Sequence, residues 1–199
     1  MIRRATILFL TFALALCGQP AQKPVWLDAA PHPTFPQWNR VGSSIPKVKK
    51  QFGDDLKEFK NRCSASLPQS VTESPETLAV TSRGWTVFKS RSDFHGIVVV
   101  SALQDYDGMC RPLGYQDFVF VNGILAGTLS PKSMDSRSDA SSVTITFAES
   151  GKILSEFNRY TEKDPLCCPS RISEVTYEIQ TSGTKPLVVV TNIRTRPSN

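Results

Sequence analysis

The sequence predicts an α+β fold that is mainly β: an antiparallel meander of about eight strands, forming a sandwich or half-barrel, with one N-terminal amphipathic helix packed on it. Three observations support this class. Short apolar segments follow one another at hairpin spacing between residues 84 and 192. Asn122-Gly123 is the dipeptide most typical of a two-residue hairpin turn. Helical spacing of apolar residues appears in one segment, residues 45–63.

Residues 1–18 have the pattern of an export leader. Arg3 and Arg4 precede an apolar run from Ile7 to Leu16, which is too short for a membrane span. Two processing sites compete. Ala13-Leu14-Ala15 suits ordinary signal peptidase, whereas Leu14-Ala15-Leu16-Cys17 resembles a bacterial lipobox, with Leu16 where a small residue is usual. The second alternative would make Cys17 the lipidated first residue of the mature protein.

The number of cysteines bears on this choice. Four cysteines follow Cys17, namely Cys63, Cys110, Cys167 and Cys168. Four can pair completely, but cleavage after Ala15 would leave Cys17 as a fifth thiol. Parity therefore favours either lipidation of Cys17 or its removal with the leader.

Residues 19–44 are predicted to be an extended tether, because five prolines there remove amide donors and fix φ. Trp26, Phe35 and Trp38 lie in this segment. We expect them to pack on the folded part and hold the tether down, and an exposed aromatic binding strip is the alternative. Residues 45–199 are predicted to form a single disulfide-stapled domain, mostly β over residues 80–192.

The predicted helix covers residues 45–63, with Ser43 or Ser44 as its cap and Pro46 in its first turn. Its apolar stripe consists of Ile45, Val48, Phe52, Leu56, Phe59 and Cys63. We expect this stripe to cover one face of the sheet.

Eight segments have the composition or alternation of strands. They are residues 85–89, 96–103, 117–121, 124–129, 142–147, 153–160, 174–179 and 187–190. Ile97-Val98-Val99-Val100 is apolar at every position, which predicts a central strand buried on both faces.

Two stretches resemble a known family. One runs from Asp107 to Thr128 and contains DGMCRPLGY and FVFVNGILAGT; the other, RYTEKDPLCCPS, runs from Arg159 to Ser170. Together they resemble the LppP/LprE-type family of bacterial envelope lipoproteins, over roughly residues 80–182. The resemblance implies an extracytoplasmic location and a lipid anchor, and it brings no catalytic residues with it.

The adjacent Cys167 and Cys168 are the most distinctive local feature. A bond between neighbouring cysteines is disfavoured by ordinary disulfide geometry, so we expect each to pair elsewhere, one with Cys63 and one with Cys110. A redox switch or a metal site formed by the adjacent pair is the alternative.

No catalytic, cofactor or metal site is predicted. The two histidines are His32 in the tether and His95 beside Asp93, and a structural role suits His95 better than general-base chemistry. Asp105, Asp107 and Gly108 lack the further ligands of a calcium loop and are read as a plain turn.

Charge argues against a nucleic-acid partner, because the formal charge of +5 includes Arg3 and Arg4 of the leader. The basic residues between Lys47 and Arg62 are mixed with three acidic ones, as on a solvated helix face. We therefore expect a non-enzymatic exported module, secreted or lipid-anchored, that binds an envelope or extracellular partner. The alternatives are a thiol–disulfide or metal protein using Cys167 and Cys168, and an inhibitor of an extracellular hydrolase.

Overall fold

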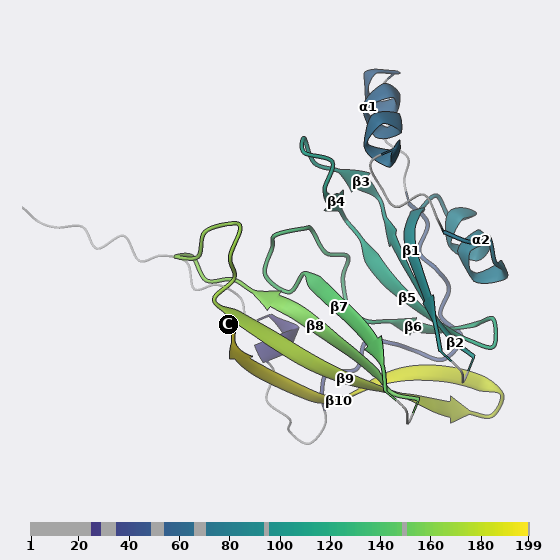
Figure 1. Cartoon of the computed structure of the whole chain (residues 1–199). Coiled ribbons are helices and arrows are strands. Elements are labelled where there is room, and N and C mark those ends of the chain that lie inside the picture. The colour runs from purple at the N-terminus through teal and green to yellow at the C-terminus, as the bar shows by residue number, and fades with distance from the viewer. Residues whose placement is uncertain are drawn as a thin grey trace, which may run out of the picture.

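Two four-stranded antiparallel sheets make up most of the computed structural model, which describes residues 25–28, 35–48, 54–65, 71–93, 96–148 and 151–198 (Figure 1). Sheet one has the order β1-β2-β5-β6, and sheet two has the order β10-β9-β8-β7. The strands of sheet one are β1 (Thr86–Ser92), β2 (Ile97–Leu103), β5 (Gln116–Val121) and β6 (Ile124–Thr128). Those of sheet two are β7 (Ser142–Phe147), β8 (Ile153–Arg159), β9 (Arg171–Ser182) and β10 (Lys185–Pro197).

The eight predicted strands are all present, and each pairs antiparallel with its neighbours in the sheet. The β5–β6 hairpin turns at Asn122 and Gly123, whose φ angles of 48° and 78° are both positive, as the turn prediction requires. Two short strands were not predicted. β3 (Asp105–Tyr106) and β4 (Pro112–Leu113) form a small hairpin between β2 and β5.

Sheet one is buried on both faces. Val99 and Val119 point into the main core, which they share with Phe157 and Tyr177 of sheet two. On the opposite face Val100 and Phe118 form a second apolar cluster. The all-apolar run of β2 is therefore central, as predicted, because both of its faces are covered.

The helix prediction was wrong at its start. Residues 45–48 are not helical; Trp85 Nε1 donates to the Pro46 carbonyl at 2.7 Å, and Val48 N donates to Arg83 O at 2.9 Å. Helix α1 (Asp54–Ala65) begins later, and the predicted stripe residue Phe52 lies outside the described residues. Ile45 and Cys63 are both buried, but in different clusters rather than on one helix face.

A helix that was not predicted covers the outer face of sheet one. It is α2 (Pro75–Thr81), and its Val80 is fully buried in the second cluster. Ser74 caps it in a capping box: Thr77 N donates to Ser74 Oγ at 3.3 Å, and Ser74 N donates to Thr77 Oγ1 at 2.8 Å. Ser74-Pro75 followed by Thr77 is the sequence signal that could have located it.

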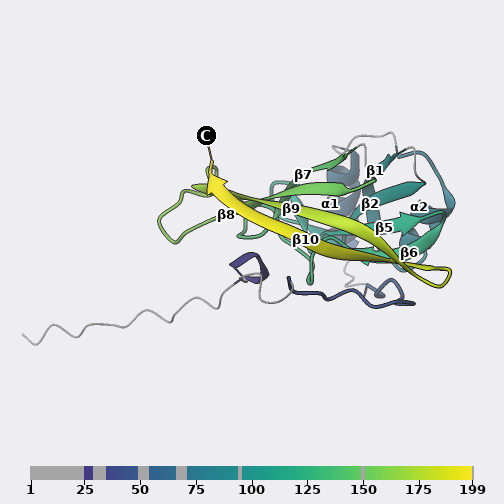
Figure 2. The same ribbon diagram turned by 90° about the horizontal axis from the view of Figure 1, so that it is seen from below.

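Residues 25–28 and 35–48, here called the strap, pack along the two sheets (Figure 2). The strap contains a short 3₁₀ helix, η1 (Trp26–Asp28). The Trp26 ring lies edge-on to Trp38, with centroids 4.9 Å apart, and to Phe157, 5.2 Å away. Both tryptophans pack against the main core, which confirms that the aromatic residues of the tether segment hold it on the domain.

Side-chain amides of the strap hydrogen-bond to the edge strands of both sheets. Gln37 donates to Val190 O at 2.9 Å and accepts from Val190 N at 3.1 Å. Asn39 Oδ1 accepts from Thr128 N at 2.9 Å, while its Nδ2 donates to Thr128 O at 3.0 Å and to Val188 O at 3.1 Å. Asn39 thus joins β6 to β10, the edge strands of the two sheets.

We predict that Gly127→Ala destabilises the protein by about 2–3 kcal/mol in urea denaturation. Gly127 has φ +143°, and a Cβ there would lie 2.3 Å from Asn39 Cγ, so the Asn39 amide would have to leave Thr128 and Val188. Gly108→Ala is the control, because nothing lies within 4 Å of a Cβ at Gly108. Equal stability of the two variants would contradict the role of the Asn39 contact.

Candidate functional site

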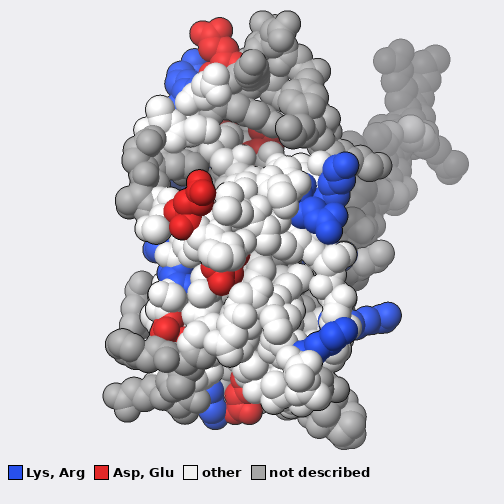
Figure 3. Space-filling view, turned by 90° about the vertical axis from the view of Figure 1, so that its right-hand side faces the viewer, with Lys and Arg blue, Asp and Glu red and all other residues white. Residues whose placement is uncertain are grey.

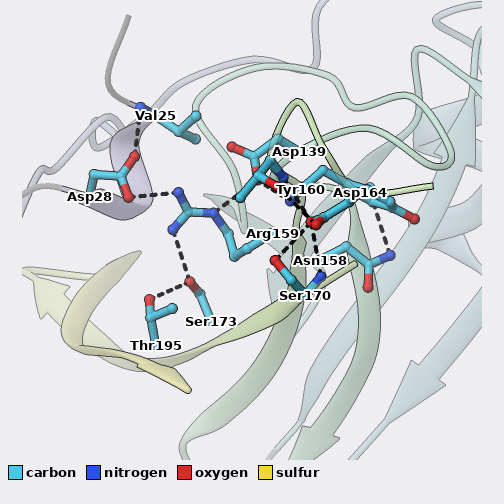
Figure 4. Close-up of polar contacts among 12 residues, drawn as sticks. Val25, Asp28, Asp139, Asn158, Arg159, Tyr160, Asp164, Ser170, Ser173 and Thr195 are labelled. Atoms are coloured by element: carbon cyan, nitrogen blue, oxygen red, sulfur yellow. Dashed lines mark hydrogen bonds and ion pairs between the residues drawn. The ribbon is translucent and has the colours of Figure 1, made fainter. Parts of the chain in front are cut away.

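The end of β8 carries a buried arginine that joins the strap to sheet two (Figure 4). The Arg159 side chain is 3% exposed. Its Nη2 donates to Asp28 Oδ1 of the strap at 2.6 Å, and its Nε donates to Asp139 Oδ1 at 3.0 Å. Its Nη1 donates to Ser173 Oγ of β9 at 3.2 Å. One guanidinium therefore connects three chain segments through its fixed fork of donors.

The partners of Arg159 are themselves held in place. Asp28 Oδ2 accepts from Val25 N at 3.1 Å, and Asp139 Oδ1 accepts from Tyr160 N at 2.9 Å. Burial alone would lower the pKa of Arg159, but the hydrogen bonds and charges of Asp28 and Asp139 raise it above its ordinary value. The arginine stays charged, and its ion pairs hold the strap against the end of β8.

The adjoining loop, residues 161–170, is organised by Asp164. Its carboxylate accepts from Thr161 N at 2.8 Å and from Ser170 N at 3.0 Å, and from the hydroxyls of both residues (Figure 4). The hydrogen bond from Thr161 N, together with those from Ser170, lowers the pKa of Asp164 below its usual range. Tyr160 Oη donates to Leu166 O at 3.2 Å, which fixes the far side of the loop.

The cysteine pairing differs from the prediction. Cys63 bonds to Cys110, and Cys167 bonds to Cys168. The end of α1 lies against the β3–β4 hairpin, which brings Cys63 within reach of Cys110 with a Cα–Cα distance of 4.9 Å. Cys167 and Cys168 lie in the β8–β9 loop at a different corner of the molecule (Figure 1), so the expected long-range bridges to this loop do not form.

The two bridges differ in what they contribute to stability. Cys63–Cys110 spans 47 residues of sequence, and loop-closure entropy assigns such a bridge about 4 kcal/mol. Cys167–Cys168 has a sequence separation of 1 and closes almost no loop, so restricting the unfolded chain gives it almost no stabilising effect. Only the Cys63–Cys110 bridge therefore stabilises the fold substantially.

Several of the predicted residues fall in ordinary turns or lie beyond the described ranges. Asp107 Oδ1 accepts from Met109 N and Arg111 N, both at 2.9 Å, and its Oδ2 pairs with Arg111 Nε. These bonds, chiefly that from Arg111 N, lower the pKa of Asp107, and the carboxylate is fully used within its own turn. Asp93 likewise accepts from Ile97 N at 2.8 Å. Cys17, His32 and His95 lie outside the described residues.

A second polar cluster lies inside the main core. Asp117 of β5 is 1% exposed and accepts from Ser101 Oγ at 2.5 Å and Ser142 Oγ at 2.8 Å. Arg91 Nη1 donates to the same Ser101 hydroxyl at 3.1 Å. Burial raises the pKa of Asp117 despite these bonds and lowers that of Arg91. Because Asp117 has no access to solvent, the cluster connects the sheets rather than binding a ligand.

The outer face of sheet two is hollowed into an open trough of about 470 Å³. Its floor consists of two cross-strand rows. One row contains Thr146, Leu154, Thr176 and Asn192, and the other contains Thr144, Glu156 and Glu174. Hydroxyl, amide and carboxylate groups surround a leucine that is 40% exposed. The trough is therefore a shallow surface that combines polar groups with apolar surface.

Charge is dispersed on the side of the molecule where α2 and the β9–β10 hairpin lie (Figure 3). Among the described residues visible there, acidic and basic side chains are scattered around a broad uncharged area. The described residues on this side therefore form no concentrated basic surface.

Sequence reasoning missed Gln37, Asn39, Asp28, Asp139 and Asp117. Arg159 and Asp164 lie within the recognised string from Arg159 to Ser170, which was the only signal for this corner. None of these groups forms a nucleophile–base pair, and the described residues contain no group of three or more His, Cys, Asp or Glu side chains arranged for a metal.

The fold and the Arg159 cluster define a class of protein: a disulfide-bonded β sandwich to which its own N-terminal segment is bound.

A comparison with known families finds a match over part of the chain. The family model described as LppP/LprE lipoprotein matches residues 92–182, from the end of β1 to the end of β9, which confirms the resemblance to that family over this range. No curated protein and no solved structure matches the chain significantly. Among the described residues, no helix has the length and apolar character needed to cross a membrane.

We predict that Arg159→Ala lowers the free energy of unfolding by about 3 kcal/mol, because Asp28 and Asp139 lose their shared cation. Arg159→Lys should recover less than half of this loss, since an ammonium group cannot reproduce the fork. Urea denaturation measures both.

Arg196→Ala is the matched control. Arg196 also pairs with two carboxylates, Glu156 at 2.8 Å and Glu174 at 2.6 Å, but it is 36% exposed. Solvent screening limits its expected contribution to below about 1 kcal/mol. If both substitutions lowered the free energy of unfolding equally, the contribution of Arg159 would not depend on its burial.

Proposed function

We propose that this protein is a non-enzymatic envelope module, anchored through a lipid on Cys17, that holds its β sandwich close to the membrane and binds an envelope partner there. One structural observation supports this proposal most: the N-terminal segment is bound to the sandwich by Trp26, Trp38, Asn39 and the Asp28–Arg159 pair. The match to a family described as lipoproteins supports the anchor.

Covalent geometry limits how far the sandwich can lie from such an anchor. Eight residue steps separate Cys17 from Val25, the first described residue. Even a fully extended chain of that length reaches about 29 Å. Because η1 is fastened to the end of β8, the β8–β9 corner is the part of sheet two held nearest to the bilayer.

We predict that the mature protein, produced with its own leader, begins at Cys17, carries a diacylglyceryl mass and sediments with membranes. Cys17→Ser should move the protein to the soluble extracytoplasmic fraction, because the substituted residue cannot form the thioether. Intact mass and cell fractionation measure both outcomes. An unlipidated chain beginning elsewhere would rule out the anchor.

The trough on the outer face of sheet two is the proposed binding surface. The longer of its two rows of side chains crosses four strands, a width of about 14 Å at the usual strand spacing. Threonine hydroxyls and Asn192 offer both donors and acceptors, and Leu154 offers an apolar contact. The carboxylates of Glu156 and Glu174 also line the trough, each paired with Arg196. An extended, hydroxyl-rich ligand such as a segment of envelope glycan suits this open surface better than a small molecule that needs enclosure.

We predict that Thr176→Trp weakens binding of soluble envelope glycan fragments by at least roughly tenfold, because the indole would fill the middle of the trough. Gln180→Trp is the control, since Gln180 lies on β9 beyond the residues that line the trough. Calorimetric titration of the two variants measures the difference. Equal binding by both, or no binding of glycan by the parent protein, would contradict this assignment.

A further inference from the structure

The β8–β9 loop presents a disulfide to solvent. Cys167 and Cys168 are bonded to each other, and both side chains are exposed. Leu166, immediately before them, is 67% exposed. Because both residues are exposed, a thiolate from outside can approach this bridge without any unfolding of the sandwich, and access is one of the main determinants of exchange.

The shape of the loop depends on groups other than this bridge. Asp164 joins the two ends of the loop through Thr161 and Ser170, and Cys168 N donates to Pro165 O at 2.9 Å. Ser198 N also donates to Ser170 O at 3.0 Å. Opening the Cys167–Cys168 bond would leave all of these contacts in place, so reduction and reoxidation can occur on the folded protein.

The other disulfide provides an internal contrast. Cys63 is fully buried in the main core, and its bond to Cys110 holds α1 to the turn between β3 and β4. Cys110 is half-buried, so a thiolate from outside has less access to this bond than to the Cys167–Cys168 bond, and none from the Cys63 side. The chain thus carries one shielded bridge that constrains the fold and one accessible bridge that does not.

We propose that Cys167–Cys168 is a site of reversible thiol–disulfide exchange with a dithiol protein. A thiolate of the partner attacks one of the two sulfurs, the Cys167–Cys168 bond breaks, and a mixed disulfide forms while the released thiolate takes a proton from solvent. The partner's second thiolate then displaces the protein's sulfur, which is protonated in turn. The partner ends as a disulfide and the two cysteines as thiols, a transfer of two electrons. Exposed Leu166 supplies an apolar contact for the partner beside the reacting sulfurs.

The test is timed reduction of the mature, fully oxidised chain with limiting dithiothreitol, followed by alkylation and peptide mapping. Cys167 and Cys168 should be alkylated at least roughly tenfold faster than Cys63 and Cys110, with no change in the thermal midpoint at the stage where two thiols have appeared. Reduction of both bridges at one rate would overturn the proposal. Alkylation of Cys167 and Cys168 before any reductant is added would overturn it as well.

A second measurement separates a protein partner from a small reductant. A thioredoxin-type dithiol protein that lacks its resolving cysteine should be trapped as a mixed disulfide on the chain. The double substitution Cys167→Ser with Cys168→Ser should abolish trapping and leave the thermal midpoint unchanged. Leu166→Ser should slow trapping while the dithiothreitol rate stays the same. Failure to trap any adduct on the parent chain would contradict exchange with a protein, and the result does not depend on whether Cys17 carries a lipid.

Discussion

The hydrogen bonds from Gln37 and Asn39 to the edges of β6 and β10 are the interaction on which the rest of the structure depends. An edge strand exposes backbone amides and carbonyls that need partners. A proline-rich segment cannot supply a full set of backbone donors, so this chain uses side-chain amides that carry the same donor and acceptor pair as a peptide bond. Asn39 reaches both sheets because Gly127 leaves room for it.

Two buried charged groups, Arg159 and Asp117, add further connections between the segments of the fold. Arg159 fastens η1 to the end of β8, and its fork is filled by two carboxylates and a hydroxyl. Asp117 joins β5 to Ser101 and Ser142 within the core between the sheets. A lipid on Cys17 would therefore connect to a rigid attachment on the sandwich, which is what a module held near a membrane requires.

Much of the fold could be predicted from local pattern, and little of the site. Alternation and the Asn122-Gly123 turn located the strands, because strand faces and hairpin turns depend on neighbouring residues. The prediction of one helix over residues 45–63 was wrong at its start. Ile45 and Cys63 fit the apolar spacing of a single helix, but they are buried in separate clusters. The prediction of the cysteine pairing was wrong because the pairing depends on which elements lie next to one another in the fold. The Asp28–Arg159 pair joins residues 131 positions apart, a separation that no local pattern encodes.

The central claim is that the strap is part of the fold rather than a free linker. The most direct measurement compares the free energies of unfolding of two unlipidated chains, one beginning at residue 19 and one at Val41. Loss of Trp26, Trp38 and Asn39 with their contacts should lower the free energy of unfolding by at least about 3 kcal/mol. Equal stability of the two chains would show that the segment before Val41 does not hold the sheets together.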